Sequence, residues 1–337
     1  MKGDGVRPQL IDNLGRRISY LRLAVTDRCN LHCRYCQSAT SRLDARRKLL
    51  SYEELIRLTR ILVAMGISKV RITGGEPFVR NGLLDLLRYL RALPGIQQLA
   101  LTTNGTLAGP HLDVLRKISL DGLNISLDTL SPQRFLEITG KDHFAKVMAF
   151  IHDAPGIIKA GAPIKINTVV QDGVNTDELL ELAQLAENLP AQVRFIELMP
   201  FNGAQGFEAT DWGIDRLRGY FAKNLPRMTE VVMPEATTAQ VFRVRGFRGT
   251  LGFIGGYSRS FCRQCNKIRI TPQGMLKTCL YDDGVLDLKE LLRSGVNDEV
   301  VESQIRQCLS HRQPNGFVAA ALLHRGQQPC SMASIGG

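Results

Sequence analysis

Six of the eight cysteines in the chain fall into two groups whose spacing suits metal chemistry. In the first group, three residues separate Cys29 from Cys33 and two separate Cys33 from Cys36. Three thiolates on one short loop can bind three corners of a cubane iron–sulfur cluster and leave the fourth iron without a protein ligand. A zinc site would need a fourth ligand, and the local candidate, His32, is badly placed between two cysteines. The loop therefore predicts a cluster with one iron open to a small molecule.

The second group lies near the C-terminus and again offers three ligands. Two residues separate Cys262 from Cys265, and thirteen lie between Cys265 and Cys279. A zinc ribbon is the alternative, and it would need Cys308 or a histidine as its fourth ligand. Cys308 and Cys330 share no such spacing, so we interpret them as a helix residue and a tail residue without metal chemistry. A second cluster with an open iron is the preferred interpretation.

Short β-branched strands alternate with amphipathic helices, and these elements must position the cysteines. The clearest helix is expected over Tyr52–Met65, where apolar residues recur at helical spacing behind a Ser51-x-x-Glu54 capping box. The first expected strand ends directly before the first cysteine loop. The expected strands are Ser19–Val25, Lys69–Thr73, Gln98–Thr102, Leu123–Leu127, Ile164–Val170, Gln192–Leu198, Gln240–Val244, Leu251–Ile254 and Lys267–Ile270.

About six βα units in the first two-thirds of the chain predict an α/β fold, a partial and open parallel β/α barrel. Catalytic groups are then expected just after the carboxyl ends of the strands. After Met199 the pattern changes to shorter, Gly-rich strands and two terminal helices. We place a boundary near residue 225, with the partial barrel in residues 1–225 and a smaller C-terminal α+β domain in residues 226–337.

The formal charge of +11 predicts an anionic partner, either nucleic acid or a phosphorylated small molecule. A basic zinc-ribbon protein that binds RNA is the non-enzymatic alternative. Aromatic residues make up only 6% of the chain, which argues against a base-stacking surface, and no nucleic-acid partner is expected. No apolar run approaches the ~20 residues that span a bilayer, and the polar first residues lack a signal-peptide core. A cytoplasmic protein without membrane contact is expected.

The first cysteine loop, placed after the first strand, resembles that of the radical S-adenosylmethionine (SAM) superfamily. Gly74-Gly75-Glu76-Pro77 follows the second strand and is in register with a further motif of this superfamily. Alone, that tetrapeptide is an ordinary turn between a strand and a helix. The resemblance implies that the open iron chelates SAM and that one electron from the cluster cleaves SAM to a 5′-deoxyadenosyl radical.

Over nearly its full length the chain resembles a narrower family, the molybdenum cofactor biosynthesis protein A family of GTP 3′,8-cyclases. The most specific marks are the two cysteine groups and the terminal Gly336 and Gly337, and further matching segments are residues 21–29, 124–128, 135–140 and 194–200. The resemblance implies radical conversion of GTP to 3′,8-cyclo-7,8-dihydro-GTP, the first step of molybdenum cofactor synthesis. It also implies two 4Fe–4S clusters, the second of which binds the guanine.

The same resemblance assigns roles to individual residues. The implied cluster ligands are Cys29, Cys33 and Cys36, and then Cys262, Cys265 and Cys279. The implied SAM contacts are Tyr35, Gly75, Ser126 and Met199. The implied GTP contacts are Arg22, Arg71, Thr102, Lys165, Lys267, Ile268 and Arg269. Gly336 and Gly337 are implied to enter the active site. The implied partners are an electron donor of the flavodoxin or ferredoxin type and the next pathway enzyme, cyclic pyranopterin monophosphate synthase, and a homodimer is permitted.

Strand alternation supports part of this assignment independently. Arg22 and Arg71 occupy strand positions that can point into a barrel, where a cation is costly unless an anion such as a triphosphate meets it. Taken singly, each would be interpreted as a surface charge.

Two features depart from the family. Lys267 stands where an arginine is expected and loses bidentate geometry, and Pro155 predicts a kink in the helical segment Phe150–Ala162.

A peptide-modifying radical SAM enzyme is the main alternative within enzymes. Such enzymes also carry auxiliary clusters in a C-terminal extension, but their extensions usually contain more cysteines than this one.

Overall fold

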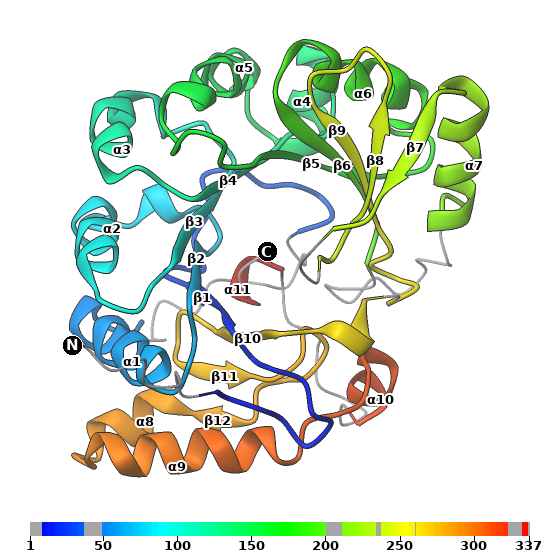
Figure 1. Ribbon diagram of the computed structural model, residues 1–337. Helices are drawn as coiled ribbons and strands as arrows, with labels where there is room; N and C mark the ends of the chain where they lie inside the picture. The colour runs from blue at the N-terminus through cyan, green and yellow to red at the C-terminus, as the bar shows by residue number, and fades with distance from the viewer. Residues whose placement is uncertain are drawn as a thin grey trace, which may run out of the picture.

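The computed structural model describes residues 9–36, 49–199, 211–233, 237–259, 261–322 and 332–335. Within these residues a single twelve-stranded sheet runs through the molecule. Its middle consists of six parallel strands that pair in chain order (Figure 1). These strands are β1 (Tyr20–Ala24), β2 (Lys69–Thr73), β3 (Gln98–Thr103), β4 (Gly122–Ser126), β5 (Ile164–Val170) and β6 (Ala191–Glu197).

Helices connect these strands along the outer side of the curved sheet, as expected for βα units (Figure 1). They are α1 (Tyr52–Ala64), α2 (Leu83–Ala92), α3 (Leu112–Ile118), α4 (Pro132–Thr139), α5 (Phe144–Asp153) and α6 (Leu179–Asn188). The predicted capping box of α1 is confirmed, because the Ser51 side chain accepts from the Glu54 amide and the Glu54 carboxylate accepts from the Ser51 amide. The kink expected at Pro155 is wrong: α5 ends at Asp153 and a 3-10 turn over Ala154–Gly156 follows, since proline lacks an amide hydrogen.

The C-terminal part of the chain extends both edges of the same sheet. Beside β6 lie β9 (Thr250–Ile254), which is parallel to it, and then the antiparallel β8 (Gln240–Val244) and β7 (Met228–Val231). Beside β1 lie the parallel β10 (Lys267–Ile270) and the antiparallel β11 (Met275–Lys277) and β12 (Leu286–Asp287). The sheet order therefore has two ends, and the predicted open barrel is confirmed. The division near residue 225 stays a prediction.

More helices follow the sixth strand than the sequence patterns indicated. They are α7 (Ile214–Asn224), α8 (Leu288–Arg293), α9 (Asp298–Leu309), α10 (Gly316–Ala321) and α11 (Met332–Ile335). The expectation of two terminal helices is thus wrong, because the short α8, α10 and α11 offer too few turns for a periodic pattern. No helix among the described residues is long and apolar enough to cross a membrane.

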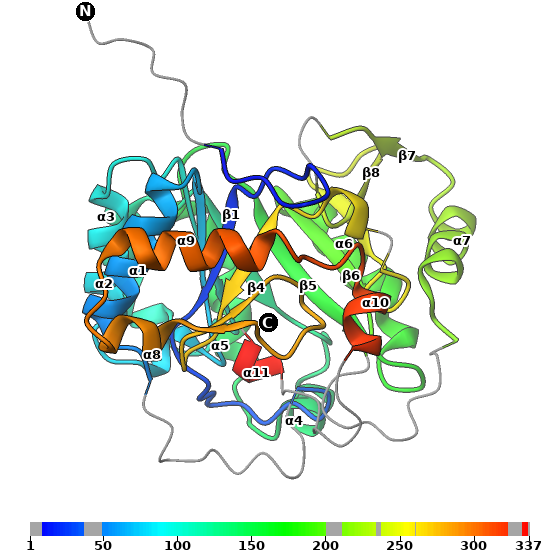
Figure 2. The ribbon, with the colours of Figure 1, turned by 90° about the horizontal axis from the view of Figure 1, so that it is seen from below.

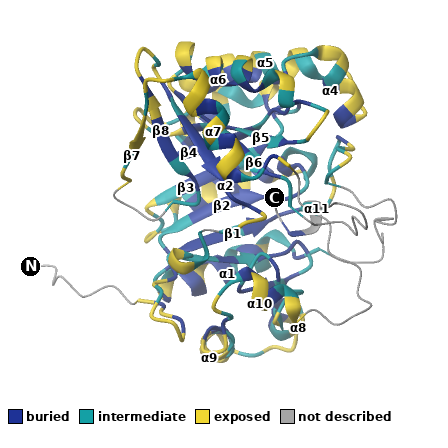
Figure 3. Ribbon diagram, turned by 90° about the vertical axis from the view of Figure 1, so that its right-hand side faces the viewer, coloured by how far each residue is buried: buried dark blue, intermediate teal, exposed yellow. Residues whose placement is uncertain are grey.

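Strand register separates a hydrophobic outer face from a polar inner face. Leu23, Ile72, Leu101 and Leu123 are neighbours across β1 to β4, and each is fully buried against the helices. Figure 3 shows this arrangement as a buried sheet between partly exposed helices. Because successive strand residues point to opposite faces, the residues between these positions point into the barrel.

Candidate active site

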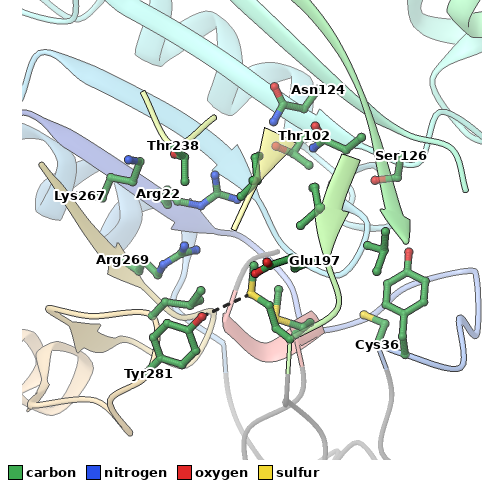
Figure 4. Close-up of a pocket in the computed structure, with 18 of the residues that line it drawn as sticks. Arg22, Cys36, Thr102, Asn124, Ser126, Glu197, Thr238, Lys267, Arg269 and Tyr281 are labelled. Atoms are coloured by element: carbon green, nitrogen blue, oxygen red, sulfur yellow. Dashed lines mark hydrogen bonds between the residues drawn. The ribbon is translucent and has the colours of Figure 1, made fainter. Parts of the chain in front are cut away.

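A cavity of about 310 Å³ lies on the inner side of the sheet and brings the two cysteine groups together (Figure 4). All six predicted ligands line it: Cys29, Cys33, Cys36, Cys262, Cys265 and Cys279. It is also lined by residues that the family resemblance assigned to SAM or GTP, namely Tyr35, Gly75, Ser126, Met199, Arg22, Thr102, Lys267 and Arg269.

Three predicted GTP contacts are not among the residues that line the cavity. Arg71 is buried and donates to the Tyr20 hydroxyl (2.7 Å) and the Leu101 carbonyl (2.8 Å). Lys165 is half-buried on the inner face of β5, next in register to Asn124, which does line the cavity. The Ile268 side chain lies in the hydrophobic core on the opposite face of β10. Gly336 and Gly337 lie outside the described residues.

Backbone contacts to α4 hold the N-terminal cysteine loop. The amide of His32 donates to the Thr139 carbonyl (2.8 Å) and the amide of Arg34 to the Ile138 carbonyl (3.2 Å). These carbonyls belong to the last turn of α4, which ends at Gly140 with φ of 70°. The segment Phe135–Gly140 therefore serves the site by anchoring the cysteine loop.

The glycines after β2 are required by close backbone packing against the same loop. The Gly75 amide donates to the Thr26 carbonyl and the Glu76 amide to the Arg28 carbonyl, both at 2.8 Å. A Cβ atom on Gly75 would lie 2.3 Å from the Arg28 carbonyl oxygen, and one on Gly74 would lie 2.6 Å from the Thr26 carbonyl oxygen. Any larger residue would push the chain that leads into the first cysteine out of place.

Buried acids and neutral donors surround the N-terminal cysteines. Asn104 and the Leu31 amide donate to the Cys29 Sγ atom at 3.7 and 3.4 Å. Burial raises the pKa of Glu76 to about 7 and that of Asp128 to about 6. Burial also raises the pKa values of the first two thiols, and each thiol has one of these acids beside it. The Tyr35 hydroxyl donates to the Asp128 carboxylate at 2.7 Å.

The C-terminal cysteines have a different electrostatic environment. Burial raises the pKa of the Cys265 thiol, but the positive charges of Arg312 and Lys267 outweigh burial and lower it overall. Burial raises the pKa of Cys279, whose amide donates to the Asp282 carboxylate at 2.7 Å. A lowered thiol pKa favours the thiolate, which is the form that binds metal.

The three thiols of each cysteine group fit a cubane cluster with one open iron. Among the described residues, no three His, Cys, Asp or Glu side chains surround a point that one metal ion would fill. Zinc needs its ligands around one centre, whereas the thiolates of a cubane cluster bind different irons. Besides burial, the thiols of each group act on one another, because Cys36 and Cys29 help to raise the pKa of Cys33, and Cys265 and Cys262 help to raise that of Cys279.

Cations form two rows across β10, β1 and β2. In one row Tyr20 lies between Lys267 and Lys69, and in the next Arg22 lies between Arg269 and Arg71. The Nζ atoms of the two lysines lie 5.7 and 5.0 Å from the Tyr20 ring centroid. Figure 4 shows Lys267, Arg22 and Arg269 on one side of the cavity.

This concentration of charge changes the pKa values of the groups within it. Burial and the adjacent Arg269 lower the pKa of Arg22 to about 9, and burial and Arg194 lower that of Lys165 to about 6. Burial alone would raise the pKa of Tyr20, but the charges of Arg71, Arg22 and Lys69 lower it to about 7. Besides burial, neighbouring cations shift these pKa values, and a bound anion would relieve their mutual repulsion.

Sequence reasoning missed several of these inner-face residues. Arg194 lines the cavity from β6, and burial and Arg71 lower its pKa to about 9. Lys69 lies two positions before Arg71 on β2. The strand alternation that identified Arg22 would have identified both, had it been applied to every strand. Asn124 and Asn167 also line the cavity, and their Oδ1 atoms are buried without a hydrogen-bond partner among the described residues.

An open parallel β/α barrel with a Cys-x3-Cys-x2-Cys loop after β1 defines the radical SAM class of proteins. The Radical SAM superfamily model matches residues 23–186, and a model described as Molybdenum Cofactor Synthesis C matches residues 191–318. The crystal structure of Streptococcus suis SuiB bound to S-adenosylmethionine aligns with a TM-score of 0.58 and 17% identity, covering 86% of this chain and 68% of that chain. At this identity the likeness shows the fold alone.

Two curated relatives narrow the class. The chain is 38% identical to GTP 3′,8-cyclase of Moorella thermoacetica, over 97% of this chain and 99% of that protein. It is 40% identical to Molybdenum cofactor biosynthesis protein 1 of Bos taurus, over 86% of this chain and 46% of that protein, so it spans about half of that relative's length. The chain belongs to the GTP 3′,8-cyclase family. Membership of the radical SAM superfamily implies a four-iron cluster and SAM.

Proposed function

We propose that the chain is a GTP 3′,8-cyclase that converts GTP to 3′,8-cyclo-7,8-dihydro-GTP in the first step of molybdenum cofactor synthesis. The observation that carries this proposal is the single cavity lined by both cysteine groups and by the cations Arg22, Lys267 and Arg269. A radical SAM enzyme needs the first cysteine group alone to cleave SAM. A second group on the same cavity, beside an anion site, indicates that a phosphorylated substrate is held there.

The residues divide the cavity between cofactor and substrate. Cys29, Cys33 and Cys36 hold the first cluster, and Tyr35, Gly75, Ser126 and Met199 contact SAM beside it. Cys262, Cys265 and Cys279 hold a second 4Fe–4S cluster that positions the guanine. When bound, the first cluster would supply the one electron that cleaves SAM to methionine and a 5′-deoxyadenosyl radical. Conversion of GTP to the cyclised product would require loss of the ribose 3′ hydrogen atom to that radical, a bond from this carbon to carbon 8 of guanine, and one further electron from the donor with a proton.

The cation rows bind the triphosphate. Guanidinium forks suit phosphate oxygens, and Arg22, Arg194 and Arg269 present such forks from three strands. Lys165 adds a charge from β5, and Thr102 adds a hydroxyl on the inner face of β3. Because these groups sit on rigid strands, they fix the ribose relative to the SAM site, which is the placement that radical transfer requires.

The C-terminal helix lies at the cavity. Figure 1 shows α11 in the middle of the barrel opening and Figure 2 shows it at one end of the strands, Met332 lines the cavity, and Ile335 is buried. Gly336 and Gly337 follow directly, and we propose that they reach the SAM site with backbone groups alone. A closed cavity excludes water and protects the radical from side reactions.

The remaining partners are those that the chemistry needs. An electron donor of the flavodoxin or ferredoxin type reduces the first cluster, and cyclic pyranopterin monophosphate synthase takes the product. Peptide modification is the competing activity for this fold, but a peptide substrate gives no reason for the two rows of cations on the inner face of the sheet.

Product analysis tests the proposal. Reconstituted protein is incubated without oxygen with dithionite, SAM and GTP, and small molecules are identified by mass spectrometry. We expect 5′-deoxyadenosine and 3′,8-cyclo-7,8-dihydro-GTP in GTP-dependent amounts, with little product from ATP. Formation of 5′-deoxyadenosine without any change in GTP would point to another substrate.

A further inference from the structure

Arg312 connects two of the three C-terminal cysteines. It follows α9, its side chain is 2% exposed, and its guanidinium donates to five groups. The Nη2 atom donates to the Cys265 Sγ atom (3.2 Å) and the Lys267 carbonyl (3.0 Å), and Nη1 donates to the Cys265 carbonyl (3.1 Å). The Nε atom donates to the carbonyl of Thr278 (2.9 Å), the residue directly before Cys279.

Two N-terminal residues extend this connection to the third cysteine. The fully buried Asp12 carboxylate accepts from Arg312 Nη1 at 3.1 Å and from Arg16 Nε at 2.7 Å. Arg16 Nη1 in turn donates to the carbonyl of Cys262 at 3.1 Å. We call Asp12, Arg16 and Arg312 the arginine clamp. It reaches the backbone at or next to all three cysteines from segments about 300 residues apart in sequence.

The charges of the clamp suit a cluster and not an empty loop. The buried Arg312 guanidinium and the Arg16 guanidinium, whose side chain is 9% exposed, share one carboxylate, which leaves one positive charge beside three thiols. A buried cation is costly unless an anion meets it, and cluster-bound thiolates supply that negative charge. At the N-terminal group, the Cys29 Sγ atom instead accepts from a backbone amide and from the neutral Asn104 side chain.

We propose that the arginine clamp assembles the C-terminal cysteines around their cluster and that the Arg312 bond to Cys265 Sγ raises the reduction potential of that cluster. Hydrogen bonds to cluster sulfurs are one of the features that set the potential, because they stabilise the more negative reduced form. Arg312 acts here as a positioning residue. The inference rests on the second cluster of the proposed function.

The test compares substitutions of Arg312 with a matched control on the preceding helix. Arg312→Gln removes the charge, and Arg312→Lys keeps the charge but cannot make all the bonds at once. Arg306→Gln removes an exposed arginine of α9 that pairs with Glu302 and is remote from these contacts. Each full-length protein is reconstituted without oxygen. Iron and sulfide are counted, and each cluster is titrated with dithionite by electron paramagnetic resonance, using SAM to identify the N-terminal signal and GTP the C-terminal one.

We expect Arg312→Gln to shift the C-terminal potential to more negative values while the N-terminal potential stays unchanged. The C-terminal cluster should also be lost to a chelator about 10- to 100-fold more readily, as is usual when a partner of a metal ligand is removed. Arg312→Lys should shift the reduction potential of the C-terminal cluster by a smaller amount. This variant supplies the titration if Arg312→Gln retains too little iron. Arg306→Gln should match the unchanged protein in both clusters.

Two results would overturn the inference in different ways. If the unchanged protein binds only about four irons, the second cluster is refuted, and the proposed role of the clamp is refuted as well. If the unchanged protein binds two clusters but both Arg312 variants keep its C-terminal potential and chelator resistance, the second cluster stands and the clamp has no effect on it.

Discussion

The two cysteine groups line one cavity but are held by opposite kinds of interaction. Backbone bonds to α4 and neutral N–H donors hold the N-terminal loop, and the buried acids Glu76 and Asp128 lie beside it. Buried guanidinium groups hold the C-terminal group, next to two rows of cations. The cavity is thus more acidic at one end and strongly basic at the other. SAM carries positive sulfonium and ammonium groups and GTP carries phosphates, so each end matches one ligand.

The largest effects on activity are expected when each cysteine group is removed in turn. Replacing Cys29, Cys33 and Cys36 together by Ala should abolish SAM cleavage and leave about half of the iron. Replacing Cys262, Cys265 and Cys279 by Ala should also remove half of the iron, but SAM cleavage should persist while cyclised GTP is lost. Iron analysis and mass spectrometry give both results. If the first variant still made 5′-deoxyadenosine, the assignment of the two ends would be wrong.

A second test perturbs only the N-terminal end. Gly75→Ala would place a Cβ atom 2.3 Å from the Arg28 carbonyl oxygen and displace the loop that carries the first cysteines. We expect SAM cleavage to fall about 100-fold, the cost typical of a small misplacement. The iron of the C-terminal cluster should stay.

Gly219→Ala is the matched control, because Gly219 is exposed in α7 and a Cβ atom there meets nothing within 4 Å. It should leave SAM cleavage unchanged and raise the free energy of unfolding by about 0.5–1 kcal/mol. Equal rates of SAM cleavage in both glycine variants would show that the close packing at Gly75 is not needed.

A third test perturbs the basic end. Arg22→Ala, Arg194→Ala and Arg269→Ala should each weaken GTP binding by about 1.5–3 kcal/mol, the loss expected for a hydrogen bond to a charged group. SAM affinity should barely change. The control is Arg88→Ala, which removes an exposed arginine paired with Asp85 on α2. Calorimetric titration measures both ligands, and unchanged GTP affinity in all three variants would mean that the cations serve another purpose.

The smallest expected effect is a change in protonation. In the free protein the pKa of Lys165 is about 6, lowered by burial and by Arg194, so at pH 7.5 its amine is mostly neutral. A bound triphosphate raises this pKa, and the amine then takes up a proton. Calorimetry in buffers of different ionisation enthalpy should therefore detect proton uptake on GTP binding.

Two variants identify the groups that take up the proton. Lys165→Met should reduce the uptake. Tyr20→Phe should also reduce the proton uptake on GTP binding. The pKa of Tyr20 is about 7 in the free protein, and a bound phosphate raises it, so the hydroxyl takes up a proton. Identical uptake in the Lys165→Met variant and the unchanged protein would contradict this assignment.

Local signals in the sequence predicted most of the fold. Strands of five to seven residues with β-branched runs were predicted to within a residue or two of their bounds, as Ile164–Val170 illustrates. The strands β11 and β12 have only three and two residues and form through pairing with neighbours, so no local pattern marks them. The four-residue β7 has no fully buried residue, so its sequence lacks the apolar alternation that marked the equally short β10. The prediction of two terminal helices was wrong for the same reason, because the missed helices are also short.

The candidate site was predictable where its signal is local. The cysteine spacing is such a signal, and it predicted that all six ligands would serve metal chemistry. Arg16 and Arg312 were not predictable, because their roles arise from contacts across some 250 to 300 residues. Arg194 lies between these cases, since strand alternation marks its position but only the three-dimensional structure brings it to the cavity, where Arg71 helps to lower its pKa.

Isotope transfer tests the central claim, that SAM at one end of the cavity acts on GTP held at the other. Reconstituted protein is incubated without oxygen with dithionite, SAM and GTP carrying deuterium at the ribose 3′ position. The account predicts one deuterium in 5′-deoxyadenosine together with cyclised GTP, and no transfer in the variant that lacks Cys262, Cys265 and Cys279. Unlabelled 5′-deoxyadenosine from the unchanged protein, with the labelled GTP recovered intact, would contradict it.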